Sequence, residues 1–245
     1  GAQDPKTAPP AGKAESKPSP SPSPKPDDIE SLKLDPPGDD VKAEIYPKDF
    51  ELTTPQAIRL FEDRVRANAR DGVSLAILGE LQARLARESG DLALFAKAET
   101  SLRNALKIDP KSTRAKLGLA AVLCDRHKFT EALQWTRELL AASPRNPDIL
   151  AVHGDACLEA GRYDEAEQTY QLLGQRLKHA VTTVRLARVA ELRGRLPEAE
   201  ALINRAIVEA RSAGESDDSQ AWYQFRAGEF YWATGNFPKS AQAFE

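Results

Sequence analysis

The chain has 245 residues, of which 41% are hydrophobic and 29% are charged, and its formal net charge is -3. This composition suits a core folded in water, and no apolar run approaches the ~20 residues that a transmembrane helix needs. A dedicated nucleic-acid binder needs a concentrated basic face, so the net charge argues against that class. Two cysteines, Cys124 and Cys157, are too few for a disulfide framework and lack zinc-site spacing, so two free thiols are expected.

The N-terminal segment differs in composition from the rest of the chain. Eleven of the 17 prolines lie at or before Pro47, and several alternate with serine between Pro18 and Pro26. Proline fixes φ and removes an amide donor, and few apolar side chains are present to offset the entropy of ordering. Residues 1–48 are therefore predicted to be a disordered tether before a domain over residues 49–245. A ligand for a proline-binding groove is the alternative to a plain spacer.

The helical pattern begins at Thr54. Its hydroxyl is placed to cap a first turn, and Pro55 suits the next position because its missing N–H costs nothing there. Ile58, Phe61 and Val65 follow at three- and four-residue spacing, which marks one face of a helix. The same period runs to the end of the chain between breaks at glycine or proline, so the domain is predicted to be all-α.

Small residues recur at a regular interval in alternate helices. One series consists of Ala57, Ala98, Ala132, Ala166, Ala199 and Ser240, and a mostly large, apolar side chain follows four residues after each member. The intervening helices carry a second series, Gly79, Ala120, Gly154, Ala187 and Gly228. The steps are 33 or 34 residues, except for a 41-residue step at each end. Because antiparallel helices approach closely only where side chains are small, the two series predict stacked helix pairs.

This spacing resembles the tetratricopeptide repeat (TPR), in its bacterial type. The copy that matches the family pattern most fully carries Gly154, Gly161, Tyr163, Ala166 and Tyr170 in the family's order.

Some positions depart from the family pattern. His153 stands where leucine is usual, and His127 replaces the turn glycine seen in other copies. The 41-residue steps each add seven residues, which predicts longer turns or extended helix ends near residues 88–95 and 212–219.

The resemblance implies an α-solenoid of antiparallel helix pairs, wound as a right-handed superhelix. About five repeats are expected after a leading helix, with the last one truncated. The first helix of each pair is expected to line a concave groove that holds an extended peptide or a partner helix. The residues expected to bind there are Leu117, Asp155, Val184, Arg185, Arg188, Trp222, Phe225, Arg226 and Glu229. The aromatic members also fit a second interpretation, in which they are uncovered core of the last repeat.

The sequence predicts a protein- or peptide-binding scaffold rather than an enzyme, with no catalytic residues and no cofactor. His153 and Cys157 lie four residues apart on one helix, but two ligands do not make a zinc site, so no metal is expected. One alternative is an accessory region of a larger enzyme whose catalytic domain lies beyond residue 245. Another is a structural solenoid of an envelope or secretory assembly. A first residue other than Met and a Pro-rich opening favour a periplasmic or extracellular location, and the oligomeric state stays open.

Overall fold

The computed structural model describes Gly1, residues 52–177 and residues 179–245. Apart from Gly1, the predicted tether lies outside the described residues. In the described part of the chain there is no strand, and the helices are α2 (Thr54–Ala67), α3 (Gly72–Ser89), α4 (Ala93–Ile108), α5 (Thr113–Asp125), α6 (Phe129–Ala142), α7 (Pro147–Glu159), α8 (Tyr163–Arg176), α9 (Ala180–Leu192), α10 (Leu196–Ser212), α11 (Asp217–Ala233) and α12 (Phe237–Phe244). None of these helices combines the length and the hydropathy needed to cross a membrane.

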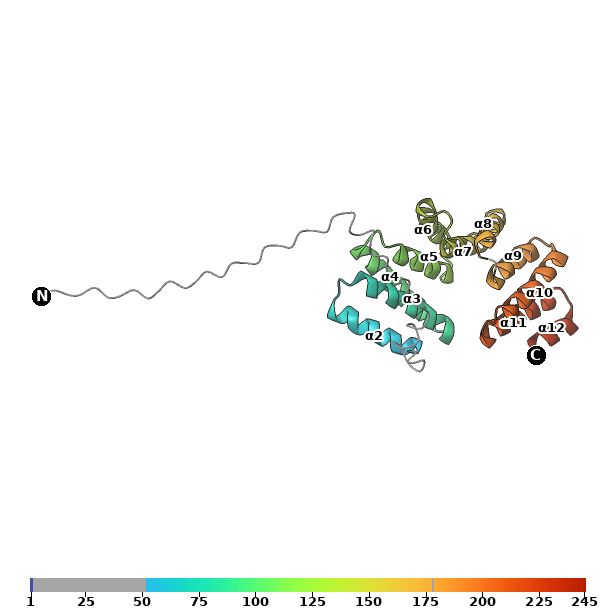
Figure 1. The fold of residues 1–245 in the computed structure, drawn as a ribbon, viewed down its shortest axis with the longest axis horizontal. Helices are drawn as coiled ribbons and strands as arrows, with labels where there is room; N and C mark the ends of the chain where they lie inside the picture. The colour runs from blue at the N-terminus through green and yellow to red at the C-terminus, as the bar shows by residue number, and fades with distance from the viewer. Residues whose placement is uncertain (2–51, 178) are drawn as a thin grey trace, which may run out of the picture. The chain divides into compact units, whose positions relative to one another are not determined.

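The helices form five antiparallel pairs after one leading helix. The pairs are α3 with α4, α5 with α6, α7 with α8, α9 with α10 and α11 with α12, and α2 packs on α3. Each pair contacts the next in chain order (Figure 1). The first helices also touch, α3 with α5 and α5 with α7. The prediction of an all-α solenoid of helix pairs is confirmed.

The start of α2 corrects the sequence prediction by one residue. Thr53, not Thr54, is the N-cap, and its N–H donates to Gln56 Oε1 at 2.9 Å in a capping box. The Thr54 hydroxyl instead donates to Glu88 Oε1 at 3.1 Å, which joins α2 to the end of α3. Two adjacent threonines both fit the cap, and proline is tolerated in the first turn after either.

The turn inside most pairs needs a residue in the left-handed region. Gly161, Gly194 and Gly235 supply it, with φ of 74°, 73° and 79°. His127 takes the equivalent place with φ of 57°, and among the described residues it is the one non-glycine residue with positive φ. The prediction that histidine replaces the turn glycine here is therefore confirmed. The left-handed backbone at His127 costs about 1–2 kcal/mol relative to a right-handed conformation.

The two longer steps of the repeat are taken up by longer helices. α3 has 18 residues and α10 and α11 have 17 each, whereas α5, α7 and α9 have 13. Gly90 and Gly214 follow the extended helices with positive φ. The added residues thus form extended helix ends, which is one of the two predicted outcomes.

The small residues mark the closest approach within each pair. A Cβ added at Gly79 would lie 2.6 Å from Leu102 Cγ. One added at Gly154 would lie 2.3 Å from Tyr170 Cε1. The large side chain of the second helix therefore crosses directly over the glycine, as the two series predicted. The small residues of the second helices are fully buried at Ala98, Ala132, Ala166 and Ala199.

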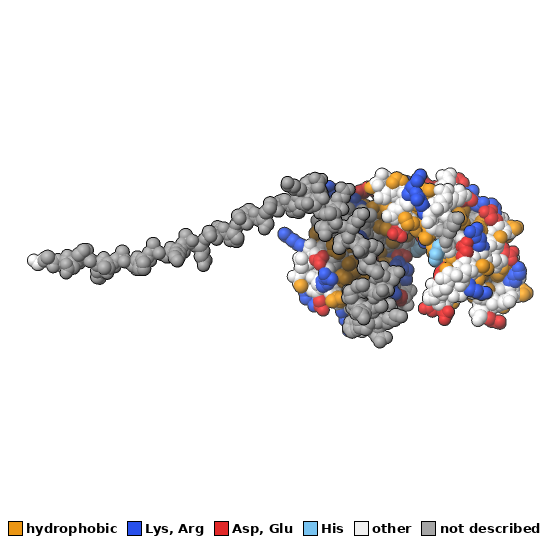
Figure 2. Space-filling model, in the orientation of Figure 1, with side chains coloured by type: hydrophobic (Ala, Val, Ile, Leu, Met, Phe, Trp, Pro, Cys, Tyr) orange, Lys and Arg blue, Asp and Glu red, His pale blue; other side chains and the backbone are white. Residues whose placement is uncertain are grey.

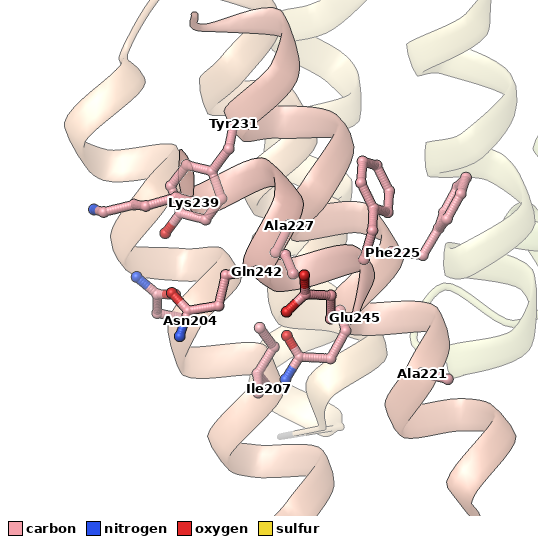
Figure 3. A pocket seen from close by; sticks show the side chains of 12 residues that line it. Asn204, Ile207, Ala221, Phe225, Ala227, Tyr231, Lys239, Gln242 and Glu245 are labelled. Carbon is pink, nitrogen blue, oxygen red and sulfur yellow. The ribbon is translucent and has the colours of Figure 1, made fainter. Parts of the chain in front are cut away.

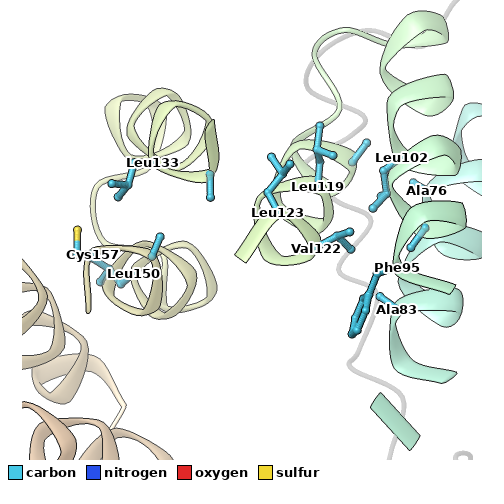
Figure 4. Close-up of a cluster of buried hydrophobic side chains, with 14 of the residues drawn as sticks. Ala76, Ala83, Phe95, Leu102, Leu119, Val122, Leu123, Leu133, Leu150 and Cys157 are labelled. Atoms are coloured by element: carbon cyan, nitrogen blue, oxygen red, sulfur yellow. The ribbon is translucent and has the colours of Figure 1, made fainter. Parts of the chain in front are cut away.

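The buried core is divided unequally along the solenoid. One cluster joins the helices from α3 to α8 and takes in Val189 of α9. Figure 4 shows part of it, with Phe95 of α4 beside Ala83 of α3, and Leu133 and Leu150 between α6 and α7. Two smaller clusters lie within α9–α12. We call α2–α8 the N-terminal stack and α9–α12 the C-terminal stack.

Candidate functional site

A hollow follows the first helices of the N-terminal stack. Its first part, of about 480 Å³, is lined by α3, α5 and the start of α7, and includes Leu117 and Asp148. Its second part, of about 690 Å³, is lined mainly by α5 and α7, and includes Cys124 and Glu159. The two parts meet at Ala121, which lines both. We call the two parts together the central groove.

The central groove combines an apolar floor with a surplus of negative charge. Leu117, Ala121 and Val152 provide half-buried apolar surface. Charged groups of both signs stand above it, and carboxylates outnumber guanidinium groups: Glu80, Asp125, Asp148, Asp155 and Glu159 against Arg87, Arg114 and Arg185. Elsewhere, on the face visible in Figure 2, basic and acidic side chains are interspersed.

Ion pairs across the groove tie successive first helices together. Arg114 of α5 makes a two-armed pair with Glu80 of α3, with Nε–Oε1 at 2.9 Å and Nη2–Oε2 at 2.6 Å. Arg87 of α3 donates to Asp125 Oδ2 at 2.7 Å. Burial raises the pKa of Asp125 above its ordinary value, although Arg87 opposes this. These side chains hold the walls of the groove in place.

A third pair joins the N-terminal stack to the C-terminal stack. Arg185 of α9 donates to Asp155 of α7, from Nε to Oδ1 at 2.8 Å and from Nη2 to Oδ2 at 2.9 Å. The Tyr170 hydroxyl donates to the same Oδ1 at 2.7 Å. Burial alone would lower the pKa of Arg185, but the hydrogen bonds and charge of Asp155 hold it above its ordinary value. The sequence analysis placed both Asp155 and Arg185 among the residues expected to bind a ligand, whereas the structure pairs them with each other.

Two carboxylates of the groove differ from the others because they have no ion-pair partner within residues 52–177 and 179–245. Asp148 and Glu159 are exposed, and neither forms an ion pair with another described residue. Cys124 lines the same part of the groove as Glu159. Burial, with Asp155, Asp125 and Glu159 nearby, raises the pKa of Cys124 to about 12.

The sequence-predicted residues fall into different settings. Leu117, Asp155 and Arg185 line the central groove. Val184 does not line any surface, because it is only 6% exposed and packs with Tyr223 of the next pair. The prediction that Val184 lines the groove was wrong. The helical period of the sequence does not reveal that a side chain of the next repeat packs over this valine.

The remaining predicted residues belong to the C-terminal stack. Trp222 and Phe225 are exposed, at 47% and 50%. Arg188 pairs with Glu191, with Nη1–Oε2 at 2.9 Å, and Arg226 pairs with Glu229 one turn along α11. These charges are therefore matched within their own helices.

Exposed aromatic rings gather at the end of the solenoid. Among the described residues, every exposed Trp and Phe lies in α11 or α12, and we call them the aromatic surface: Trp222, Phe225, Trp232, Phe237 and Phe244. Phe225 and Phe244 lie with ring centroids 5.6 Å apart. They border a second hollow of about 800 Å³ between α10, α11 and α12, which Ile207 and Tyr231 also line (Figure 3).

Asp125 and Glu159 were missed by the sequence analysis. Both stand five residues after the small residue of their first helix, Ala120 and Gly154 respectively. Acidic groups at the same repeat position in neighbouring copies were the signal that would have located this wall of the groove.

Comparison with known proteins agrees with this architecture. A tetratricopeptide repeat family model matches residues 80–147 and 152–216, which is more than half of the chain, and a second matches residues 123–180. No curated protein matches the sequence.

Solved structures of several repeat proteins are similar to this chain. PilW, described as a widely conserved type IV pilus biogenesis factor, is 20% identical with a TM-score of 0.60, covering 78% of this chain and 82% of PilW. A thermophilic TPR protein of Thermus thermophilus is 21% identical with a TM-score of 0.57, covering 69% of this chain and 88% of its own. MamA from Desulfovibrio magneticus RS-1 is 19% identical with a TM-score of 0.54, covering 65% and 86%. These similarities concern the fold, and with the family match and the helix pairs they lead to one conclusion: the chain belongs to the tetratricopeptide repeat family.

Proposed function

We propose that the chain is a scaffold that binds an extended segment of another protein in the central groove, with basic side chains of the ligand beside Asp148 and Glu159. The observation that carries the proposal is a groove with an apolar floor and two exposed carboxylates that have no ion-pair partner among the described residues. A ligand Lys or Arg supplies the missing partner, and its aliphatic stem covers the apolar floor.

The geometry of α7 sets the spacing of the ligand's basic groups. Asp148 lies in the first turn of α7 and Glu159 is its last residue. At 1.5 Å per residue, their backbones stand roughly 16 Å apart along the helix axis. An extended peptide advances about 3.3 Å per residue, so it spans this distance in about five residues. The preferred ligand therefore carries two basic residues about five positions apart with apolar residues between them.

An array of synthetic peptides tests the charge and the spacing together. Peptides of equal length carry two Lys, two Glu or two Gln at separations from two to eight residues. The Lys series is expected to bind best near a separation of five and to weaken as salt rises, because exposed charges are screened. Equal binding of the Lys and Glu series would contradict the proposal.

Variants of the groove test the site itself. Asp148→Asn combined with Glu159→Gln is expected to weaken the best Lys peptide roughly tenfold, which corresponds to about 1.4 kcal/mol. The matched control is Glu62→Gln with Asp218→Asn, which removes two exposed carboxylates outside the groove. Equal losses in both double variants would indicate an effect of net charge alone and would overturn the site.

The aromatic surface supports a second candidate function, the binding of a partner through aromatic and Arg contacts. Aromatic and Arg side chains are enriched among residues that dominate binding energy, and every exposed Trp and Phe of the described residues lies in this surface. Arg188→Ala with Phe225→Ala is then expected to lower affinity for such a partner about thirtyfold, as loss of ~2 kcal/mol requires.

An exported location, a role in an envelope assembly and a link to a catalytic domain stay predictions.

A further inference from the structure

A cluster of three ligand-type side chains lies within the third pair, close to where α7 packs on α6 of the second pair. His153 and Cys157 of α7 are buried, and Glu165 of α8 is half-buried. One ligand atom from each lies within 4.8 Å of the other two. The sequence showed two of these side chains four residues apart, and folding adds the third from the neighbouring helix.

Two of the three separations within the cluster match those around a tetrahedral metal ion, and the third, between Cys157 Sγ and the Glu165 carboxylate, is within 4.8 Å. His153 Nε2 lies 3.3 Å from Glu165 Oε1 and 3.6 Å from Cys157 Sγ. A zinc ion holds nitrogen and oxygen at about 2.0–2.1 Å and sulfur at about 2.3 Å, which places tetrahedral ligands about 3.3–3.6 Å apart. These two distances therefore need no rearrangement of His153.

Hydrogen bonds and an ion pair from neighbouring side chains orient His153 and Glu165. His153 Nδ1 lies 2.8 Å from the Thr136 hydroxyl, which also bonds the carbonyl of Ala132 at 3.1 Å. In the tautomer that frees Nε2, Nδ1–H donates to the Thr136 oxygen and that hydroxyl donates to the carbonyl. Metal-bound histidines are held in this way. Glu165 keeps a second anchor, because Arg162 pairs with its other oxygen, Oε2.

The polar groups at this junction stand where the repeat places apolar ones. At the preceding junction the positions of Thr136 and His153 are occupied by Leu102 and Leu119, both fully buried. Replacing two core leucines by a hydroxyl and an imidazole costs stability unless the polar atoms gain a purpose-built partner. The two departures occur together at one junction, where the Thr136 hydroxyl contacts Nδ1 of His153, a member of the cluster.

We infer that His153, Cys157 and Glu165 bind a divalent metal ion of the zinc type, with water completing a four-coordinate site. Coordination displaces the Cys157 thiol proton, which passes to solvent, and the half-exposed Glu165 side gives access. The ion clamps α7 to α8, and Thr136 of α6 orients the histidine.

Cobalt is the probe, because tetrahedral Co²⁺ bound to thiolate absorbs in both the near-ultraviolet and the visible. The full chain is purified, reduced and stripped with a chelator, then titrated with Co²⁺ and afterwards with Zn²⁺. One equivalent of Co²⁺ is expected to give a thiolate charge-transfer band and tetrahedral visible bands, and Zn²⁺ is expected to remove both. Absence of these bands in the folded chain would overturn the inference.

Matched variants assign the bands to the cluster. Cys157→Ser is expected to abolish the charge-transfer band and Cys124→Ser to retain it, since Cys124 lies in the central groove instead. His153→Leu restores the residue usual in the repeat, so it keeps the fold while removing a ligand. Thr136→Val is expected to weaken binding by about 10- to 100-fold, as the loss of a group supporting a metal-bound histidine does. Bands that persist in His153→Leu, or that vanish in Cys124→Ser, would place the metal elsewhere.

Discussion

The N-terminal and C-terminal stacks are built from the same repeat but differ in how their surfaces are used. In the N-terminal stack one buried cluster runs from α3 to α8, and charged side chains face each other across the central groove. In the C-terminal stack the core is split into two smaller clusters, and large aromatic rings stay exposed on α11 and α12. The Asp155–Arg185 pair connects the two.

This contrast shows which part of a repeat is constrained by folding and which is free for function. The small residue of each first helix is fixed by the approach of its partner helix, so it recurs in both stacks. Positions facing away from that contact vary between acidic, Arg and aromatic residues from one pair to the next. Two surfaces of different chemistry therefore stand on one scaffold.

The largest expected difference concerns a methyl group added at the helix crossing. Gly154→Ala places Cβ 2.3 Å from the ring of Tyr170, which is fully buried and anchored on Asp155. We expect a loss of about 1–3 kcal/mol, as overpacking of a core usually costs. Gly228→Ala meets Phe244 at 2.5 Å, but that ring is 49% exposed and can swing outward, so its loss should stay below about 1 kcal/mol.

The control for both variants is Gly174→Ala in α8. Its added Cβ meets nothing closer than Thr182 Cγ2 at 3.6 Å, so the gain in helix propensity, about 0.5–1 kcal/mol, should dominate. Urea unfolding followed by circular dichroism measures all three. If Gly154→Ala proved as stable as Gly174→Ala, the close-approach account of the repeat would fail.

A buried carboxylate makes the stability of the N-terminal stack depend on pH. The corresponding dependence in the C-terminal stack is expected to be weaker. Burial alone would raise the pKa of Glu99, but hydrogen bonds from Lys128 and Arg103 and the charge of Arg126 hold it below its ordinary value of 4.5. Its stabilisation is therefore complete at neutral pH and is lost as the pH falls below about 4.5 through the lowered value. Glu99→Gln should cost about 1–3 kcal/mol at neutral pH and reduce this acid sensitivity.

Glu200 of the C-terminal stack provides the comparison. The pKa of Glu200 is also lowered, by Lys239 and Tyr231, yet its side chain is 36% exposed and water screens the pair. Glu200→Gln should cost less than about 1 kcal/mol at neutral pH. Chemical unfolding of both variants from neutral pH down to about pH 3 checks the difference, and equal losses would show that burial of Glu99 does not matter.

The smallest expected effect is the response of each surface to changes in the other. Arg188→Ala with Phe225→Ala should leave affinity for the best Lys peptide within about twofold, since neither residue lines the central groove and distant sites act nearly independently. Calorimetric titration of this variant, beside Asp148→Asn with Glu159→Gln, separates the two surfaces. A large loss in the C-terminal variant would mean that one ligand spans both stacks.

The sequence predicted the scaffold well because the scaffold depends on spacing. Gly79 and Gly154 recur with the repeat since each lies under a large side chain of its own hairpin, which is a local relationship. His127 was identified in the same way, from the glycines at equivalent turns. Such features follow from position within one copy and need no knowledge of long-range contacts.

The candidate sites were predicted less well because they depend on side chains from different pairs. Asp155 and Arg185 are 30 residues apart in sequence, yet their side chains form two hydrogen bonds with each other. The repeat pattern predicts Val184 at the surface, but Tyr223 of the next pair packs with it in one buried cluster. Glu165 joins His153 only when α8 folds back on α7. Side-chain rotamers and the side chains of neighbouring helices determine these contacts. The spacing of small and apolar residues in the sequence specifies neither of them.

Hydrogen–deuterium exchange of the full chain, with and without the best Lys peptide, tests most directly whether the central groove is the binding site. The account predicts that peptide binding slows exchange in α5 and α7, whose side chains form the floor and walls, and leaves α11 and α12 unchanged. Asp148→Asn with Glu159→Gln should remove this protection at the same peptide concentration. Protection confined to α11 and α12, with α5 and α7 unaffected, would contradict the account.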